Sequence, residues 1–356
     1  MEFGYKGGYM KKVDYLLLIA IIIISLFGLL MIYSSSYVWA EYKFNDPYKF
    51  LKAQAIFLLI GYVIMIIVSN IPYLKYLDKA NIIFGVCFLL LILVLIPGIG
   101  TIRNGSRSWF GIGSLGIQPS EFTKLALIIF TSKYLSKNEK LLKDIKKGVL
   151  PILGILLLVF ALIMLQPDFG TGVVIVMTII VLLFVSGVKM GFFIKIGVLG
   201  LIGIATLVII APYRLKRIVS FINPWTDPLG SGFQIIQSLY SIGPGGLLGL
   251  GLGNSIQKHF YLPEPQTDFI FSIISEEFGF MGILIVASLF IIIIYRGFKI
   301  SMNCNNKFGK YLAFGITFGL SFQALLNLMV VVGLIPVTGV TFRGTHLLHT
   351  LFSPYN

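Results

Sequence analysis

Long apolar runs follow one another along almost the whole chain, separated by shorter polar segments. An α-helix of about 17–25 mostly apolar residues can cross a hydrocarbon core of about 30 Å, and nine runs reach about this length. Their approximate bounds are 14–33, 52–69, 79–97, 120–136, 149–165, 171–188, 191–211, 268–295 and 311–336. The pattern therefore predicts an all-α fold, a polytopic transmembrane helix bundle with about nine spans.

Composition supports this prediction. Of the 356 residues, 57% are hydrophobic and only 12% are charged, whereas an ordinary soluble domain carries about 25% charged residues. The apolar runs leave little chain for a separate soluble domain. Two cysteines, Cys87 and Cys304, are too few for a disulfide framework or a cysteine metal site.

The net charge of +14 is explained by lysines that set the membrane topology, so we expect no nucleic-acid partner. If the N-terminus is cytoplasmic, every predicted inside segment carries positive charge, as the positive-inside rule requires. Two predicted outside segments, 98–119 and 212–267, are long and rich in Gly, Pro, Trp and Arg. Segments of this length are usually functional or disordered, and the anchoring aromatic residues argue against disorder.

The first candidate constellation lies at the end of the second long segment, in the sequence YLPEPQTDFIF (261–271). Thr267 is a suitable N-cap for the next span, which would place Asp268 in its first turn at the outer mouth of the bundle. Glu264 precedes it, and Glu276 and Glu277 follow deeper in the span. Carboxylates at that depth are functional candidates, although Asp268 could simply interact with the helix dipole and the two glutamates could form internal salt bridges.

The second constellation joins the sequence GSRSW (105–109) to QPSEFTK (118–124). Pro119 and Ser120 mark a helix start. Glu121 and Lys124 are three residues apart and therefore share one helix face just inside the outer interface. Lys124 could be a snorkelling anchor. A buried pair next to Arg107 would instead suit an anionic ligand.

A third group of candidates follows the seventh span and contains Arg214 and Arg217, then Gln237 and Ser238, then a glycine-dense stretch at 243–253. Basic residues outside depart from the positive-inside pattern, so they would face lipid headgroups or a phosphorylated substrate. The glycines would permit close backbone approach to a ligand or a helix. Asp168, in a short outer turn, adds another carboxylate. All these constellations fall on the same side of the membrane, which indicates one extracytoplasmic site.

Together these sequences resemble the FtsW/RodA/SpoVE family of shape, elongation, division and sporulation proteins. The resemblance extends from about residue 14 to Thr341 and is closest to the SpoVE and FtsW branches. Its motifs are GSRSW, QPSEFTK, QPDFGTG, NPWTDPLGSGFQIIQSL, the glycine-dense stretch and YLPEPQTDFIFSIISEE. Gln266 stands where many members have histidine.

The resemblance implies a ten-span enzyme of the bacterial cytoplasmic membrane that polymerises lipid II and works with a class B penicillin-binding protein. It implies that Asp268 is catalytic, and we expect it to be the general base for the acceptor hydroxyl. Arg107, Lys124, Arg214 and Arg217 would bind the pyrophosphate, with Glu121 orienting Lys124. A divalent cation such as Mg²⁺ or Mn²⁺ could bridge pyrophosphate and carboxylate, although no ligand cluster specifies one.

The chain departs from the family after Thr341. Family members continue into a Pro- and Gly-rich loop and a tenth span, whereas residues 342–356 here form a short, atypical tail. We therefore divide the chain into a membrane domain, 1–341, and a truncated or frameshifted tail, 342–356.

Two other functions remain open from the sequence. A lipid II flippase would need a polar path through the membrane, for which Glu276 and Glu277 are the strong candidates; the clustering of the other polar residues outside favours the enzyme. A non-catalytic scaffold for the penicillin-binding protein is the second alternative, and the missing tenth span favours it.

Overall fold

The computed structural model describes residues 13–103, 106–111, 116–210, 219, 221–230, 232–263 and 265–336. The helices in these residues are α1 (Tyr15–Phe44), α2 (Lys49–Asn70), α3 (Leu74–Leu93), α4 (Pro119–Lys137), α5 (Leu150–Met164), α6 (Phe169–Val185), α7 (Met190–Ile210), α9 (Phe233–Ile242), α10 (Ile270–Met302) and α11 (Lys307–Val331). Shorter turns are η1 (Glu139–Lys143), η2 (Ile145–Val149) and η3 (Pro224–Thr226). Strands β1 (Thr101–Arg103) and β2 (Ser106–Trp109) form an antiparallel hairpin.

Each of the nine predicted spans overlaps one of these helices, which confirms the polytopic helical class. Six of the helices (α1, α2, α3, η2 with α5, α10 and α11) are long and apolar enough to cross a membrane, and α6 and α7 contribute shorter apolar stretches. Helix α4 is more polar because it packs against α3, α6 and α11 and buries hydroxyl groups inside the bundle. Those buried residues are Ser120, Thr123, Thr131 and Ser132.

Two predicted helix ends were wrong. Helix α1 continues to Phe44 instead of ending near residue 33. The serines can remain in the buried helix because the hydroxyls of Ser35 and Ser36 find an acceptor in the carbonyl of Ile32 and need no water. Helix α10 begins at Ile270, with Phe269 as its N-cap residue. Asp268 therefore precedes the helix, and Thr267 is not the cap.

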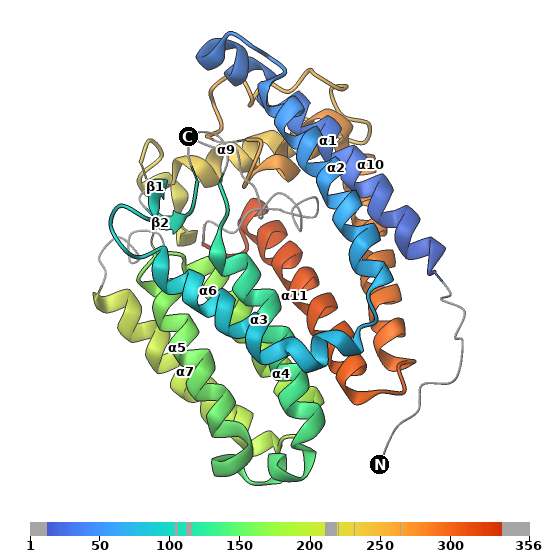
Figure 1. Ribbon diagram of the computed structural model, residues 1–356. Coiled ribbons are helices and arrows are strands. Elements are labelled where there is room, and N and C mark those ends of the chain that lie inside the picture. Colours follow the sequence, from blue (N-terminus) through green and yellow to red (C-terminus); the bar gives the residue numbers. More distant parts are fainter. Residues whose placement is uncertain are drawn as a thin grey trace.

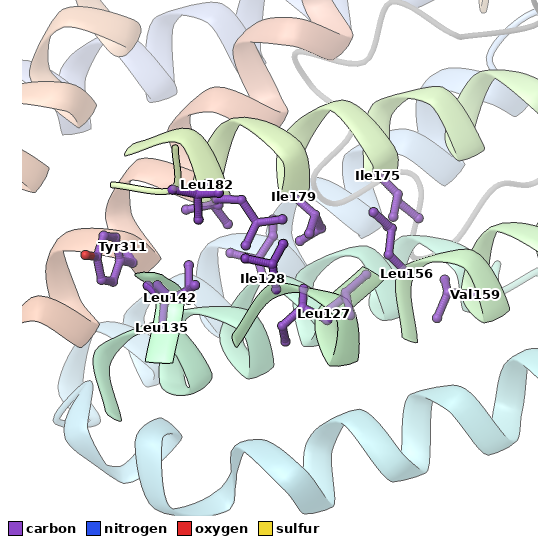
Figure 2. Packing of buried hydrophobic residues seen from close by; sticks show 14 of the residues in the cluster. Leu127, Ile128, Leu135, Leu142, Leu156, Val159, Ile175, Ile179, Leu182 and Tyr311 are labelled. Carbon is purple, nitrogen blue, oxygen red and sulfur yellow. The ribbon is translucent and has the colours of Figure 1, made fainter. Parts of the chain in front are cut away.

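Helix α11 lies between two groups of helices and joins their cores (Figure 1). On one side it packs against α4 and α6. In the hydrophobic cluster there, Leu127 of α4, Leu156 of α5 and Leu182 of α6 lie close together (Figure 2). Tyr311 of α11 belongs to this cluster. On the other side, Val331 of α11 belongs to the cluster that α1 and α10 form. Displacing α11 would therefore disturb both cores.

Helix α10 is kinked at Gly279, whose φ of 61° and ψ of −155° are not helical. At this kink residues 245–251 of the glycine-dense stretch enter the hydrogen-bond ladder of the helix. The amides of Leu250 and Gly251 donate to the carbonyls of Glu276 and Glu277, at 2.9 Å each. In return, the amides of Phe280 and Met281 donate to the carbonyls of Gly246 and Leu247, at 2.9 and 3.1 Å. The glycines therefore serve close approach to a helix, one of the two roles expected from the sequence.

A side chain at this contact should destabilise the protein. A Cβ on Gly249 would lie 2.1 Å from the carbonyl oxygen of Glu277, and φ at Gly249 is +80°, so Gly249→Ala combines overlap with a left-handed backbone that costs about 1–2 kcal/mol. Gly253→Ala is the matched control, because Gly253 has φ of +84° but a Cβ there would have nothing within 4 Å. We expect the melting temperature of the detergent-solubilised protein to fall several degrees further for Gly249→Ala; equal shifts would contradict the close packing.

Candidate active site

The expected outer constellations lie at one end of the bundle, where Figure 1 shows β1, β2 and α9 close together. Two hydrogen bonds connect the first long segment to the α5–α6 turn. The hydroxyl of Ser106 donates to the carbonyl of Gln166, and the amide of Gln118 donates to the carboxylate of Asp168 at 3.0 Å. The hairpin and this turn are therefore fixed to each other next to the start of α4.

Asp168 is the N-cap residue of α6. Its carboxylate accepts a hydrogen bond from the backbone amide of Thr171 at 3.1 Å and, through its other oxygen, from Gln118. Such a cap satisfies an amide that the helix itself cannot satisfy. These contacts make Asp168 a structural support of the outer surface.

Glu121 and Lys124 form an ion pair in the first turns of α4. The ammonium of Lys124 lies 2.7 Å from Oε2 of Glu121, and the two side chains, Lys124 and Glu121, are 16% and 9% exposed. The same ammonium donates to Oε1 of Gln323 on α11 at 2.6 Å. Lys124 is thus directed into the bundle and is not a snorkelling anchor. These two described partners accept from two of the three N–H groups of the ammonium. The third N–H group is left for a ligand or water.

Arg107 lies on β2, opposite Ile102 of β1, and it is partly buried. Its side chain passes close to Gly100, where a Cβ would lie 3.0 Å from Cγ of Arg107. Among the described residues, no ion pair joins Arg107 to Glu121. The structure therefore brings Arg107 to the same end of the bundle as Lys124 without bonding it to the Glu121–Lys124 pair.

Asp268 lies immediately before the N-cap of α10 and is partly exposed, while Phe269 is buried. Its backbone carbonyl accepts a hydrogen bond from the side-chain amide of Asn327 on α11 at 3.0 Å, and Asn327 is fully buried. The backbone of Asp268 is therefore held between two helices, and the residue is partly exposed at this end of the bundle.

Ser238, on α9, connects the amphipathic outer helix to the same region. Its hydroxyl lies 2.7 Å from the hydroxyl of Ser272 on α10 and 2.7 Å from the carbonyl of Val331 on α11. Gln237 precedes it and is partly exposed. Helix α9 is thus fixed to the first turn of α10 and to the last residue of α11.

Glu276 and Glu277 are completely buried and take part in an internal network. Oε1 of Glu277 lies 2.8 Å from the ammonium of Lys258, and both side chains are 0% exposed. Ser34 of α1 donates to Glu277 as well. Glu276 accepts from the hydroxyl of Ser255 at 2.6 Å and from the amide of Ile256 at 2.8 Å. The glutamates therefore hold the segment 255–258 against α1 and α10, which is the internal salt-bridge role left open by the sequence.

Three residues of this end escaped the sequence analysis: Lys258, Gln323 and Asn327. A lysine in an outside segment departs from the positive-inside pattern, and that signal could have identified Lys258. Gln323 and Asn327 are polar residues in an apolar span and lie four residues apart, which could have identified a polar face on α11.

Arg214, Arg217, Glu264 and the tail 342–356 lie outside the described residues, so their predicted roles stay predictions. The part of the chain that the structure describes contains no group of three or more His, Cys, Asp or Glu side chains that could hold a metal ion. The described side chains therefore give no reason to assign Mg²⁺ or Mn²⁺ to particular ligands.

A bundle of membrane-length helices with acidic, basic and amide side chains gathered at one end defines a polytopic membrane protein with a site at that end. The family model described as cell cycle protein, FtsW/RodA/SpoVE, matches residues 14–343. Stage V sporulation protein E of Bacillus subtilis is 51% identical over 92% of this chain and 90% of that protein. The probable peptidoglycan glycosyltransferase FtsW of Geobacter sp. (strain M18) is 38% identical over 96% and 94%. The chain belongs to the FtsW/RodA/SpoVE family.

Solved structures agree with this assignment. A chain of a peptidoglycan synthase complex, in which polymerization and crosslinking are structurally coordinated, superposes with a TM-score of 0.77 at 29% identity, covering 96% of this chain and 95% of that one. The rod shape determining protein RodA of Thermus thermophilus gives a TM-score of 0.66 at 25% identity, covering 96% and 94%. The predicted family resemblance and the polytopic helical fold are both confirmed.

The buried Lys258–Glu277 pair should show strong coupling. Removing one partner leaves an uncompensated buried charge, so Lys258→Met and Glu277→Gln should each destabilise the protein by about 3–5 kcal/mol. The double variant should lose clearly less unfolding free energy than the sum of the two single variants. Thermal unfolding of the wild type, the two single variants and the double variant completes this double-mutant cycle. Glu139→Gln, which breaks an exposed pair with Lys307, is the control and should cost at most about 1 kcal/mol. Additive losses at Lys258 and Glu277 would contradict a direct interaction.

Proposed function

We propose that this chain is a peptidoglycan glycosyltransferase that polymerises lipid II on the outer face of the bacterial cytoplasmic membrane, with its N-terminus in the cytoplasm. A class B penicillin-binding protein is its partner, and division or sporulation is its setting. The observation that carries the proposal is the geometry of α11. On one face of this helix, Gln323 contacts Lys124 of the Glu121–Lys124 ion pair, and Asn327, about one turn further along, contacts the backbone of Asp268. Glycosyl transfer from a pyrophosphate needs both a cation and a carboxylate.

The acceptor side of the reaction requires a base. In glycosyl transfer the acceptor sugar hydroxyl attacks the anomeric carbon of the donor sugar, and the hydroxyl proton must be removed as the new C–O bond forms. A carboxylate within hydrogen-bonding distance can accept this proton. Asp268 is partly exposed at the outer end of the bundle, where a lipid-linked sugar would lie, so we assign the base role to Asp268.

The donor side requires positive charge. As the bond from the anomeric carbon to the phosphate oxygen breaks, its electron pair leaves with the polyprenyl pyrophosphate. Fixed cations at the developing charge stabilise that transition state. Lys124 is held by Glu121 and Gln323, which orients its ammonium before substrate binds. Arg107, Arg214 and Arg217 are the further candidates for the pyrophosphate, and Gln237 and Glu264 for the sugar or peptide. Ser238, predicted as a further substrate contact, is completely buried and fixes α9 to α10 and α11 instead.

A flippase is less well supported, because Glu276 and Glu277 were the candidates for its polar path. Both carboxylates are buried and bonded to Lys258, Ser34 and Ser255. Moving a charged pyrophosphate past them would require breaking this network. Named relatives add support for the enzyme, since the FtsW relatives are described as probable peptidoglycan glycosyltransferases.

Asp268→Asn tests the proposal. The change keeps size and hydrogen bonding but removes the basic oxygen, so polymerisation of labelled lipid II by the full chain with its penicillin-binding protein should fall at least 100-fold. Asp168→Asn is the matched control: it alters a carboxylate at the same end of the bundle that caps α6, and it should lower the melting temperature while leaving turnover within about tenfold.

Unchanged polymerisation by Asp268→Asn would remove the base role. No polymer from the wild type, after the protein is shown to be folded and bound to its partner, would contradict the enzyme and favour a scaffold.

A further inference from the structure

One face of α11 makes a polar contact at three successive turns. Gln323, Asn327 and Val331 are spaced four residues apart, so they lie on nearly the same side of the helix at intervals of about 6 Å. Each contacts a different element: Gln323 the ammonium of Lys124 on α4, Asn327 the carbonyl of Asp268, and Val331, through its carbonyl, the hydroxyl of Ser238 on α9. We call Gln323, Asn327 and Val331 the α11 polar face.

We propose that Gln323 and Asn327 are positioning residues that set the distance and relative direction of the Lys124 ammonium and the Asp268 carboxylate. The inference rests on the proposed glycosyl transfer, in which these groups act on opposite sides of one reacting carbon. Both contacts come from one continuous helix. The ammonium of Lys124 and the backbone of Asp268 are therefore both positioned relative to α11.

Gln323 acts through Lys124. Glu121 supplies one acceptor to the ammonium from within α4, three residues away. Gln323 supplies the second from a different helix, at 2.6 Å. Two acceptors in different directions restrict a side chain that is otherwise flexible, so the ammonium is already ordered before substrate binds. Lys124 is therefore oriented relative to α11 as well as to its own helix.

Asn327 acts through the backbone of Asp268. Its amide donates to the carbonyl of Asp268 at 3.0 Å, and it is completely buried, so it has little freedom to move. Asp268 precedes the first residue of α10, where the helix itself does not determine the direction of the chain. Fixing the carbonyl fixes the peptide plane after Asp268 and thereby restricts the direction in which its side chain leaves the backbone.

The positions of the other polar groups on α11 support a specific role. Ser321, only two residues from Gln323, donates its hydroxyl to the carbonyl of Thr317 in its own helix at 2.6 Å. Thr317 likewise donates to Ala313. The side-chain hydrogen bonds of Gln323 and Asn327, in contrast, cross to residues 199 and 59 positions away in the sequence.

Steady-state polymerisation of labelled lipid II by the full chain with its penicillin-binding protein tests the inference. Gln323→Met removes the acceptor at similar volume and should raise KM for lipid II roughly tenfold with little change in kcat, whereas Gln323→Glu keeps an acceptor and should stay within about twofold of the wild type. Asn327→Leu should lower kcat roughly 10- to 100-fold with KM within about twofold, because small misplacement of a base has effects of that size.

Ser321→Ala is the control and should leave both constants unchanged. Melting temperature and co-purification with the partner report folding; if Asn327→Leu does not fold, Asn327→Ala replaces it. The positioning role would be overturned if Gln323→Met and Asn327→Leu kept the wild-type kcat and KM per folded molecule. It would also be overturned if their activity fell only in proportion to the folded fraction. An active wild type with an equally active Asp268→Ala variant would instead refute the base on which the inference rests, and an inactive wild type would refute both.

Discussion

The requirement that every backbone amide and carbonyl inside a membrane has a hydrogen-bond partner governs the arrangement of α10 and the glycine-dense stretch. An unsatisfied group in hydrocarbon costs several kcal/mol, and a kink at Gly279 leaves several groups of α10 without their helical partners. The stretch at 245–251 satisfies them by exchanging amides and carbonyls with the helix. These hydrogen bonds satisfy the non-helical backbone directly, since most residues of the stretch are exposed and not enclosed by protein.

This exchange requires glycine at the contact. Gly245, Gly249 and Gly279 each approach the opposing backbone so closely that a Cβ would lie 2.0–2.5 Å from it. The same contact determines where the following segment runs, because residues 255–258 continue directly from the stretch and reach Glu276 and Glu277. One backbone constraint therefore positions both the buried ion pair and the segment that leads to Asp268.

Much of the fold could be predicted because hydrophobic run length is a local property. The nine spans follow from it. The pairing of Glu121 with Lys124 follows from another local property, since the two residues are three apart on one helix. The extension of α1 to Phe44 could not be predicted, since three consecutive serines end an apolar run and only their burial shows that the helix continues. The partners of Lys124 and Asp268 on α11 also could not be predicted, because the helices that bring them together are distant in sequence.

The buried glutamates show why depth in a span is an incomplete guide to function. Ionisable residues in a membrane are functional candidates because their burial is costly. Hydrogen-bond and ion-pair partners from elsewhere in the chain offset that cost without any catalytic role. Lys258 supplies one positive charge to Glu277, and Ser34, Ser255 and the amide of Ile256 supply neutral donors to the two carboxylates. Lys258 lies ten residues before Asp268, and Asn327 contacts the backbone carbonyl of Asp268 itself. The buried charges thus fix the segment that precedes Asp268, whereas Asp268 itself and Lys124 are only partly buried.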